Sequence, residues 1–402
     1  MKKHGRIIKK TALLMLAAFI SAVGSGCWGA LEINEIGIVK ATGIDMEPDG
    51  SLRVTVLSVQ PEGMATTPVT KSMMWIGTAT GKTLSDAVAN LRSIAFRRLS
   101  WLHNRIMIVG EDKARSDMGD VVDFLLRSRE LRLRNCILIA EGRAFDMLRV
   151  PADVQMDYST ELEGLIENPD FWSKAYAPCA KEILVNFAEK GIEGIAGRIS
   201  YYYSSRETFS SPREEYEKLD KRGEELPIAF MEGSAVFKAF KMEGWLNGAE
   251  TRGYMWITGK AKRGIIVRAF DGGIASMENI SANSRISVNI EGSKINACVK
   301  TDIRGRLVEY TADINLENTE AVSIIEQALS QVIKSEMEAA VKKAKEYGAD
   351  IFGFGRSIYR DFPGQWAMME KDWEKIFPQV EVSFDVSVTL NRPGMILRSL
   401  SR

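Results

Sequence analysis

The last apolar segment of the chain, residues 380–390, alternates without a break between apolar and polar side chains. Its apolar members fall on every second residue from Val380 to Leu390. Successive side chains of a β-strand point to opposite faces of a sheet, so this pattern predicts a strand with one buried face and one solvated face. The fold must therefore contain a sheet with one face open to water.

The longest helical pattern precedes this strand, over about residues 318–347. Apolar residues recur at helical spacing along one face, and Glu and Lys occupy the other face, as in a surface helix. Asn318 can cap its start and Gly348 can end it. Ahead of this helix, the sequence favours β-type segments separated by Gly-rich turns, around residues 228–238, 253–259, 264–270, 284–290 and 295–300.

The first half of the chain alternates between strand and helix patterns. Residues 33–45 and 51–60 flank a Pro-Asp-Gly turn and predict a β-hairpin. A strand at 72–77, a helix that Thr83 can cap, a strand at 105–110, a helix over 117–129 and a strand at 136–140 follow. Residues 151–200 are more helical, with breakers at Asn168-Pro169 and Ala177-Pro178. The whole pattern predicts an α+β protein with mixed sheets and helices in several domains.

Residues 204–226 are charged and nearly free of large aliphatic side chains, which is typical of a solvated linker. We therefore expect an N-terminal α+β region at 27–203, divisible near 150–200, and a C-terminal α+β domain at 227–402. The 402 residues allow two or three domains.

The amino terminus, residues 1–26, is predicted to be a signal peptide. Five basic residues and no acidic residue precede an apolar run over 11–23, and small residues follow. Thirteen residues of helix span only about 20 Å, which is short of the roughly 30 Å core of a bilayer. Removal of this segment leaves 48 basic and 53 acidic residues among 376.

Cys27 is the predicted site of lipid attachment. In bacterial lipoproteins a cysteine at this place receives a diacylglyceryl group and becomes the first residue after cleavage. Ser25 and Gly26 fit the usual preceding pattern, whereas Gly24 stands where Leu is usual. Two acyl chains anchor a protein much more firmly than one.

Little of the sequence favours an enzyme or a metal protein. Cys136, Cys179 and Cys298 form no C-x-x-C pair, and their redox state is left open, although Cys136 is expected to be buried. His103 is the only histidine after Cys27, and a structural role with a hydrogen-bonding partner is favoured for it. We predict no catalytic, cofactor-binding or metal-binding residue; an exported hydrolase, which would need a carboxylate pair in a pocket, is the alternative with the weakest sequence support.

Two further patterns are interpreted as structural. Residues 77–83 resemble a phosphate-binding loop, but the required first glycine would fall on Ile76, so a strand–turn–helix corner is expected and no nucleotide. The basic clusters at Arg97-Arg98 and 127–134 are interleaved with acidic residues and lack a base-stacking pattern. They are expected to be solvated faces, without nucleic acid as a partner.

Four stretches resemble the Ger(x)C family, the lipoprotein C subunits of spore germinant receptors. They are the opening Cys27-Trp28 with its following EINEIGIVKATGID, HNRIMIVGEDKA at 103–114, the segment 233–260 (GSAVFK…WITGK), and the ending 349–394 (ADIFGFG…FPQVEVSFDVSVTLNRPG). The resemblance implies three α+β domains in the arrangement of that family. It also implies a non-enzymatic subunit on the outer face of the spore inner membrane, acting with a multi-pass A subunit and a permease-like B subunit. Only Cys27 is carried over as a functional position.

The alternative is an extracytoplasmic solute-binding lipoprotein that captures a small nutrient directly. It requires a deep cleft between the two halves with convergent polar groups. The aromatic segments around Trp245–Trp256 and Phe352–Trp366 are candidate partner surfaces, but small apolar cores are favoured for them.

Overall fold

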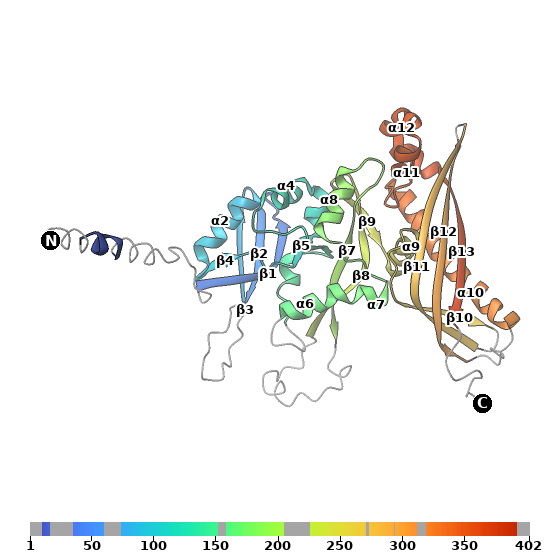
Figure 1. Ribbon diagram of the computed structural model, residues 1–402, viewed down its shortest axis with the longest axis horizontal. Coiled ribbons are helices and arrows are strands. Elements are labelled where there is room, and N and C mark those ends of the chain that lie inside the picture. Colours follow the sequence, from blue (N-terminus) through green and yellow to red (C-terminus); the bar gives the residue numbers. More distant parts are fainter. Residues whose placement is uncertain are drawn as a thin grey trace, which may run out of the picture.

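The computed structural model describes residues 10–16, 35–59, 74–151, 158–204, 226–270, 273–292, 294–311 and 319–391. Two mixed β-sheets follow one another along the long axis of the molecule (Figure 1). The first sheet lies at one end of this axis, and the second sheet lies at the opposite end. The prediction of an α+β fold with mixed sheets is confirmed.

The first sheet contains, within the described residues, nine strands in the order β3-β2-β1-β5-β6-β7-β8-β9, with β4 beside β1. β1, β5, β6 and β7 are parallel neighbours, and the outer pairs are antiparallel. The strands are β1 (Ile36–Met46), β2 (Leu52–Val59), β3 (Met74–Gly81), β4 (Arg98–Ser100), β5 (Ile106–Gly110), β6 (Cys136–Ala140), β7 (Ile195–Ser204), β8 (Leu226–Lys238) and β9 (Lys241–Leu246).

Helices cover both faces of this sheet, which explains why β5 and β6 are apolar and buried at every residue. α2 (Leu84–Ile94), α3 (Glu111–Ser116), α4 (Gly119–Arg127) and α8 (Ala180–Ala188) pack on one face. α5 (Ala144–Met147) and α6 (Tyr158–Glu167) pack on the other, and the short α7 (Pro169–Trp172) follows α6. Thr83 caps α2 as predicted, and the two Pro breakers fall where α7 begins and just before α8.

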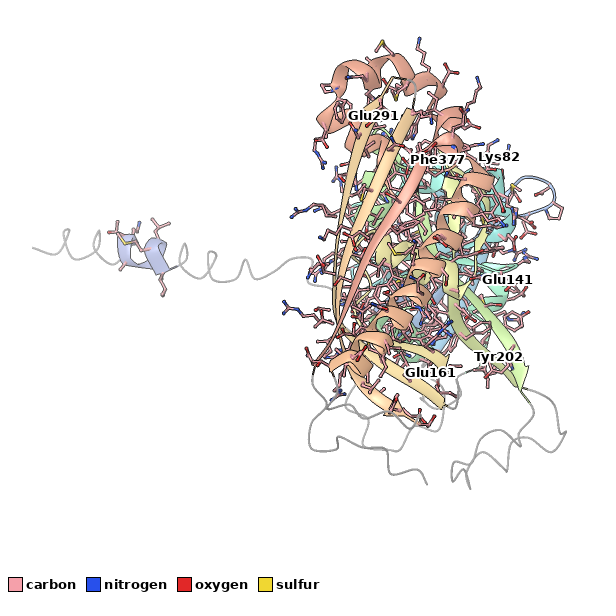
Figure 2. All side chains as sticks on the ribbon, turned by 90° about the vertical axis from the view of Figure 1, so that its right-hand side faces the viewer. Lys82, Glu141, Glu161, Tyr202, Glu291 and Phe377 are labelled. Carbon is pink, nitrogen blue, oxygen red and sulfur yellow. The ribbon has the colours of Figure 1, made fainter. Side chains whose placement is uncertain are left out.

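The second sheet has the order β10-β11-β12-β13 and lies in front of the first sheet in the end-on view of Figure 2. Its strands are β10 (Ile265–Phe270), β11 (Gly273–Glu291), β12 (Lys294–Tyr310) and β13 (Glu381–Asn391). Along β13 every second side chain is exposed, so the predicted strand with one solvated face is confirmed. The inward face packs against α10 (Thr319–Tyr347), the predicted long helix, whose expected cap Asn318 lies outside the described residues.

The expected strand at residues 253–259 is wrong, because most of that segment belongs to α9 (Gly248–Ile257). The side chain of Asn247 accepts the N–H of Glu250 at 2.9 Å, and the Glu250 carboxylate accepts the N–H of Asn247 at 2.8 Å. This reciprocal capping box starts a helix there. Eight of the ten residues of α9 are buried, so the helix shows no polar stripe from which its period could be recognised.

Short helices complete the second body between α10 and β13. They are α11 (Phe354–Asp361), α12 (Pro363–Met369) and α13 (Trp373–Ile376), with 3₁₀ turns at Glu370–Asp372 and Phe377–Gln379. Trp366, Trp373 and Phe377 are buried in the core that these helices share with α10 and the second sheet. Phe352 and Phe354 are also buried there, in agreement with the favoured interpretation that these aromatic residues fill a core.

The charged segment between β7 and β8 connects two neighbouring strands of one sheet. β7 and β8 pair in antiparallel fashion from Ile195 opposite Val236 to Ser204 opposite Leu226. The first sheet therefore continues across the segment that we interpret as a linker. The division of the chain into domains stays a prediction.

Candidate functional site

Cys27, the predicted lipid attachment site, lies outside the described residues, so its modification stays a prediction. The described residues resume at Glu35, eight positions further along the chain. No described helix is both long enough and apolar enough to span a bilayer. Because only eight positions separate Cys27 from Glu35, the end of the body that carries Glu35 is the described part nearest to Cys27 along the chain.

This end is built where β4 joins the start of β1. Ile36 is paired with Arg98 and Ile38 with Ser100, in parallel register. Gly37 lies between these pairs, and a Cβ atom there would come within 2.9 Å of Ser58 Oγ and 3.3 Å of a Leu99 methyl group. The lack of a side chain at Gly37 thus lets β4 approach β1 closely and brings its arginines beside Glu35.

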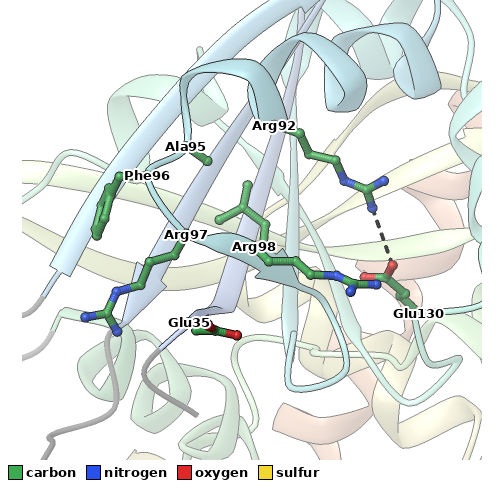
Figure 3. Close-up of a pocket in the computed structure, with 8 residues that line it drawn as sticks. Glu35, Arg92, Ala95, Phe96, Arg97, Arg98 and Glu130 are labelled. Atoms are coloured by element: carbon green, nitrogen blue, oxygen red, sulfur yellow. Dashed lines mark hydrogen bonds and ion pairs between the residues drawn. The ribbon is translucent and has the colours of Figure 1, made fainter. Parts of the chain in front are cut away.

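A cavity of about 750 Å³ opens at this place (Figure 3). Three arginines and two carboxylates contribute the charges of its lining, which is formed by Glu35, Arg92, Ala95, Phe96, Arg97, Arg98, Leu99 and Glu130. The cavity therefore has more cationic than anionic side chains. The residues come from the position before β1, from the segment that runs from the end of α2 into β4, and from the loop after α4. No local sequence pattern joins these three parts of the chain.

The acidic groups of the cavity neutralise only part of its positive charge. Glu130 lies 3.4 Å from Arg92, and its second oxygen accepts the N–H of Trp101 at 3.3 Å. Arg97 and Arg98 form no ion pair with any described residue. Arg97 lies over the Phe96 ring at 5.8 Å, and its Nη1 is buried with no acceptor among the described residues.

Large apolar side chains are exposed in and directly after the chain segment that lines this cavity. Phe96 is 61% exposed and Ile94 is 58% exposed, and Leu102 follows β4 with 47% exposure. Exposed arginines next to exposed apolar side chains form a mixed surface that is typical of an interaction site.

A second polar cluster lies where the two sheets meet. The ammonium group of Lys260 lies 2.6 Å from the Tyr176 hydroxyl and 3.0 Å from the Tyr254 hydroxyl, and it forms an ion pair with Glu182. Burial disfavours the ammonium, but its interactions with Tyr254 and Glu182 outweigh that effect and raise the pKa of Lys260. Burial has the opposite effect on the Tyr176 hydroxyl and raises its pKa, because it disfavours the phenolate. The ion pair and the two hydrogen bonds of Lys260 fix α8 to the end of α9.

Asp350 organises the turn that follows α10, in the stretch Asp350–Gly355 that contributes to the family resemblance. Its carboxylate accepts the N–H groups of residues 352–355 and the indole N–H of Trp373, over 2.7–3.2 Å. Burial raises the pKa of Asp350 to about 6, although these hydrogen bonds act to lower it. The motif is thus structural, since one buried carboxyl group holds a whole turn of backbone.

The residues that resembled a phosphate loop form a corner between β3 and α2, as expected. A Cβ atom on Gly81 would come within 2.3 Å of the backbone nitrogen of Ala87, so the strand lies directly against the helix start. Asp86 accepts the N–H of Lys82 at 2.9 Å. A carboxylate from the chain itself therefore binds backbone at the place where a phosphate would lie.

The remaining chemical candidates are separated from one another. His103 is exposed and makes no hydrogen bond to another described residue, so the favoured hydrogen-bonded role is not seen. Cys136 is buried as predicted and lies directly opposite Cys179 in an isolated antiparallel bridge, whereas Cys298 is exposed on the second sheet. Within the described ranges, no group of three His, Cys, Asp or Glu side chains could hold a metal ion.

Two family models match separate parts of the chain. Residues 29–201 match the family described as spore germination protein N-terminal domain, and residues 232–394 match spore germination B3/GerAC like, C-terminal. The Bacillus subtilis (strain 168) spore germination protein KC is 22% identical, over 97% of this chain and 97% of its own length. Spore germination protein B3 of the same organism is 23% identical, over 92% of this chain and 95% of its own length. The chain belongs to the GerC family of spore germination proteins.

A solved structure shares the fold. The crystal structure of the GerBC protein superimposes with a TM-score of 0.54 at 16% identity, over 87% of this chain and 96% of that chain. The predicted multi-domain arrangement of this family is thereby confirmed.

Proposed function

We propose that the chain is a lipid-anchored, non-catalytic subunit of a nutrient germinant receptor on the outer face of the spore inner membrane. In this role it assembles or couples a multi-pass A subunit and a permease-like B subunit. The match of both halves to germination protein families supports the proposal most directly. The first of these matches begins at residue 29, two positions after the cysteine predicted to carry the lipid.

Membrane attachment gives a physical reason for such a subunit. A tethered protein meets its membrane partners at an effective concentration that reaches the millimolar range for short linkers. Contacts that would be too weak in solution are then sufficient for assembly. The lipid acts on the rate and extent of assembly rather than on a chemical step.

The arrangement of the halves favours this role over direct nutrient capture. A solute-binding cleft would need an open space between residues 27–203 and 227–402. The strands β7 and β8 instead join these two parts by a continuous backbone ladder. Near it, Tyr176 and Tyr254 pack edge to face with their ring centres 5.4 Å apart.

The substitution Cys27→Ala tests the proposal. We expect the variant to leave the membrane fraction of spores and to impair nutrient-triggered germination, because the tether no longer concentrates the subunit beside its partners. Cell fractionation and loss of optical density after nutrient addition are the measurements. Cys298→Ala, which changes an exposed cysteine at the other end of the molecule, is the matched control.

An unrelated membrane-spanning segment fused ahead of the Cys27→Ala chain should restore germination. This rescue separates tethering from any effect on folding. Retention of Cys27→Ala in the membrane together with normal germination would overturn the proposal.

A further inference from the structure

We propose that the cavity lined by Arg92, Arg97 and Arg98 binds phosphate-bearing headgroups of anionic phospholipids. The molecule would then stand on the bilayer with this end down and with the second sheet farthest from the membrane. The inference rests on the lipid attachment at Cys27 proposed above. It adds a second, non-covalent contact that fixes orientation.

Covalent geometry limits how far this cavity can be from the membrane. An extended chain spans at most about 3.6 Å per residue, so the eight residues from Cys27 to Glu35 cover no more than about 29 Å. Glu35 itself lines the cavity. The second sheet lies at the opposite end of the long axis (Figure 1). A lipid on Cys27 therefore holds this end of the body, and not the other, beside the headgroups.

The charges of the cavity suit a phosphate. Guanidinium groups bind phosphate oxygens in paired, planar hydrogen bonds. Glu130 is engaged by Arg92 and by the backbone N–H of Trp101, and neither Arg97 nor Arg98 forms an ion pair with a described residue. With Glu35 and Glu130 both in the lining, three cations face two anions. Arg129 lines an adjoining groove together with Arg92 and adds a fourth cation.

Exposed apolar side chains distinguish a bilayer surface from a free anion. A protein that rests on a membrane buries apolar side chains at the boundary between headgroups and acyl chains, beside basic residues that contact the phosphates. Phe96, which lines the cavity, and Ile94 supply such side chains in the chain segment that carries the arginines, and Leu102 lies two residues after β4. A site for a soluble phosphate compound would not require exposed apolar side chains.

Vesicle binding of the full mature chain without its lipid tests the inference. The exported Cys27→Ala chain, which keeps every other residue, is mixed with vesicles of phosphatidylglycerol and phosphatidylcholine or of phosphatidylcholine alone. We expect sedimentation with the anionic vesicles only, weakened by salt. Replacing Arg92, Arg97 and Arg98 by Gln should reduce this partitioning at least tenfold, since each basic residue near an anionic surface contributes severalfold.

A control of equal charge is available at the far end of the molecule. Lys294, Lys300 and Arg306 are exposed on β12, and their replacement by Gln should change partitioning less than twofold. Phe96→Ser should weaken vesicle binding but leave any binding of inorganic phosphate unchanged. Should the triple arginine variant fail to fold, the pair Arg92→Gln and Arg98→Gln, which alters exposed side chains only, replaces it.

Orientation is tested on the lipidated protein by hydrogen exchange. Amides of residues 92–102 should be protected in anionic vesicles relative to detergent, and amides of β12 should not. Equal binding of wild type and arginine variant, equal binding to neutral vesicles, or displacement by inorganic phosphate alone would overturn the inference. So would loss of partner subunits from the arginine variant without any loss of vesicle binding, which would assign the cavity to an acidic protein surface.

The two proposals can fail separately. Cys27→Ala spores with normal membrane retention and germination would refute the lipid tether, whatever the arginines bind. A correctly tethered protein whose arginine variant binds vesicles normally would refute only the headgroup contact.

Discussion

At the joint between the two sheets, Glu193 and Asp350 place two carboxyl groups close enough for their charges to interact. The N–H of Glu193 donates to the backbone oxygen of Asp350 at 2.8 Å. Burial raises the pKa of Glu193 to about 7, with a further contribution from Asp350, although a hydrogen bond from the N–H of Ala239 acts to lower it. The native state therefore keeps a proton on Glu193 at pH values where the unfolded chain has lost it.

This proton makes the free energy of unfolding depend on pH. A carboxyl group whose pKa is raised in the native state stabilises the fold at pH values below the pKa that it has in the unfolded chain. That contribution is lost as the pH rises toward about 7. We expect Glu193→Gln, which keeps an oxygen for the N–H of Ala239, to remove about 1–2 kcal/mol of the stability loss between pH 5 and pH 8. Urea unfolding at both pH values measures it. Glu309→Gln, at an exposed site, should keep the wild-type slope, and an equal slope in both variants would contradict the assignment.

Cys136 and Cys179 are predicted to form a disulfide when a disulfide or diamide oxidant accepts their two electrons. The hydrogen bonds from Ile137 N to Pro178 O and from Ala180 N to Asn135 O flank the pair, which makes it a non-hydrogen-bonded pair of an antiparallel bridge. Cα atoms in such pairs lie about 4.5 Å apart, within the range that a disulfide spans. Burial raises the pKa of Cys136 to about 12, so the more accessible Cys179 should react first.

Peptide mapping should find this bond and none to Cys298, and the oxidised protein should gain about 2–4 kcal/mol in stability. Cys298→Ser should oxidise like the wild type. Oxidation through Cys298, or no oxidation at all, would show that the facing pair cannot close.

At the scale of secondary-structure elements, the helices α9 and α10 approach each other very closely at Gly253. A Cβ atom there would lie 2.0 Å from the backbone oxygen of Glu336. Beside it, Arg252 and Glu336 form a buried ion pair, and Trp256 donates to the same carboxylate at 3.0 Å. The helices cross at a position where only glycine fits, and the ion pair fixes their register.

Gly253→Ala should therefore lower the free energy of unfolding by about 1–3 kcal/mol, because the helices must separate to admit a methyl group. Gly164→Ala on α6 is the matched control, since nothing lies within 4 Å of its Cβ position. That control should be neutral or stabilising by up to about 1 kcal/mol. Thermal unfolding of the two variants distinguishes a steric effect from a change in helix propensity, and equal shifts would contradict the steric explanation.

The elements that could be predicted are those in which the local pattern of apolar and polar residues shows which side is buried. The alternation in β13, the single apolar face of α10 and the cap of α2 each reflect one buried and one solvated side. α9 was predicted as a strand because it is buried almost all round, which removes the helical period. The arginine cavity was missed because it depends on the parallel pairing of Ile36 with Arg98, two residues far apart in the chain.

At the scale of the whole molecule, the joint between the two sheets is held by direct contact between two backbone segments. Gly191, with a φ of +70°, lies so close to Gly355 that a Cβ atom would come within 2.3 Å of its carbonyl carbon. The N–H of Arg356 donates to the oxygen of Gly191 at 2.8 Å. Ion pairs from Lys190 to Glu370 and from Lys238 to Glu374 flank this contact.

The β7–β8 ladder predicts that the two halves of the chain depend on each other. Expressed separately, residues 27–204 and 226–402 should aggregate, because each exposes a strand with unpaired N–H and C=O groups. Co-expressed, they should elute as one particle on size-exclusion chromatography. An intact chain cut at a protease site inserted within 205–225 is the control and should also remain one particle. A soluble, folded, monomeric C-terminal half would contradict this prediction and favour independent domains.

Because Ser204 and Leu226 are register partners, the chain leaves the sheet and re-enters it at neighbouring positions. Closing a loop between two points already held together costs an entropy that grows only logarithmically with loop length. Insertions, deletions and substitutions between Ser204 and Leu226 should therefore have little effect on folding. It is the natural place to insert a fluorescent reporter or an affinity epitope for following the protein in living spores.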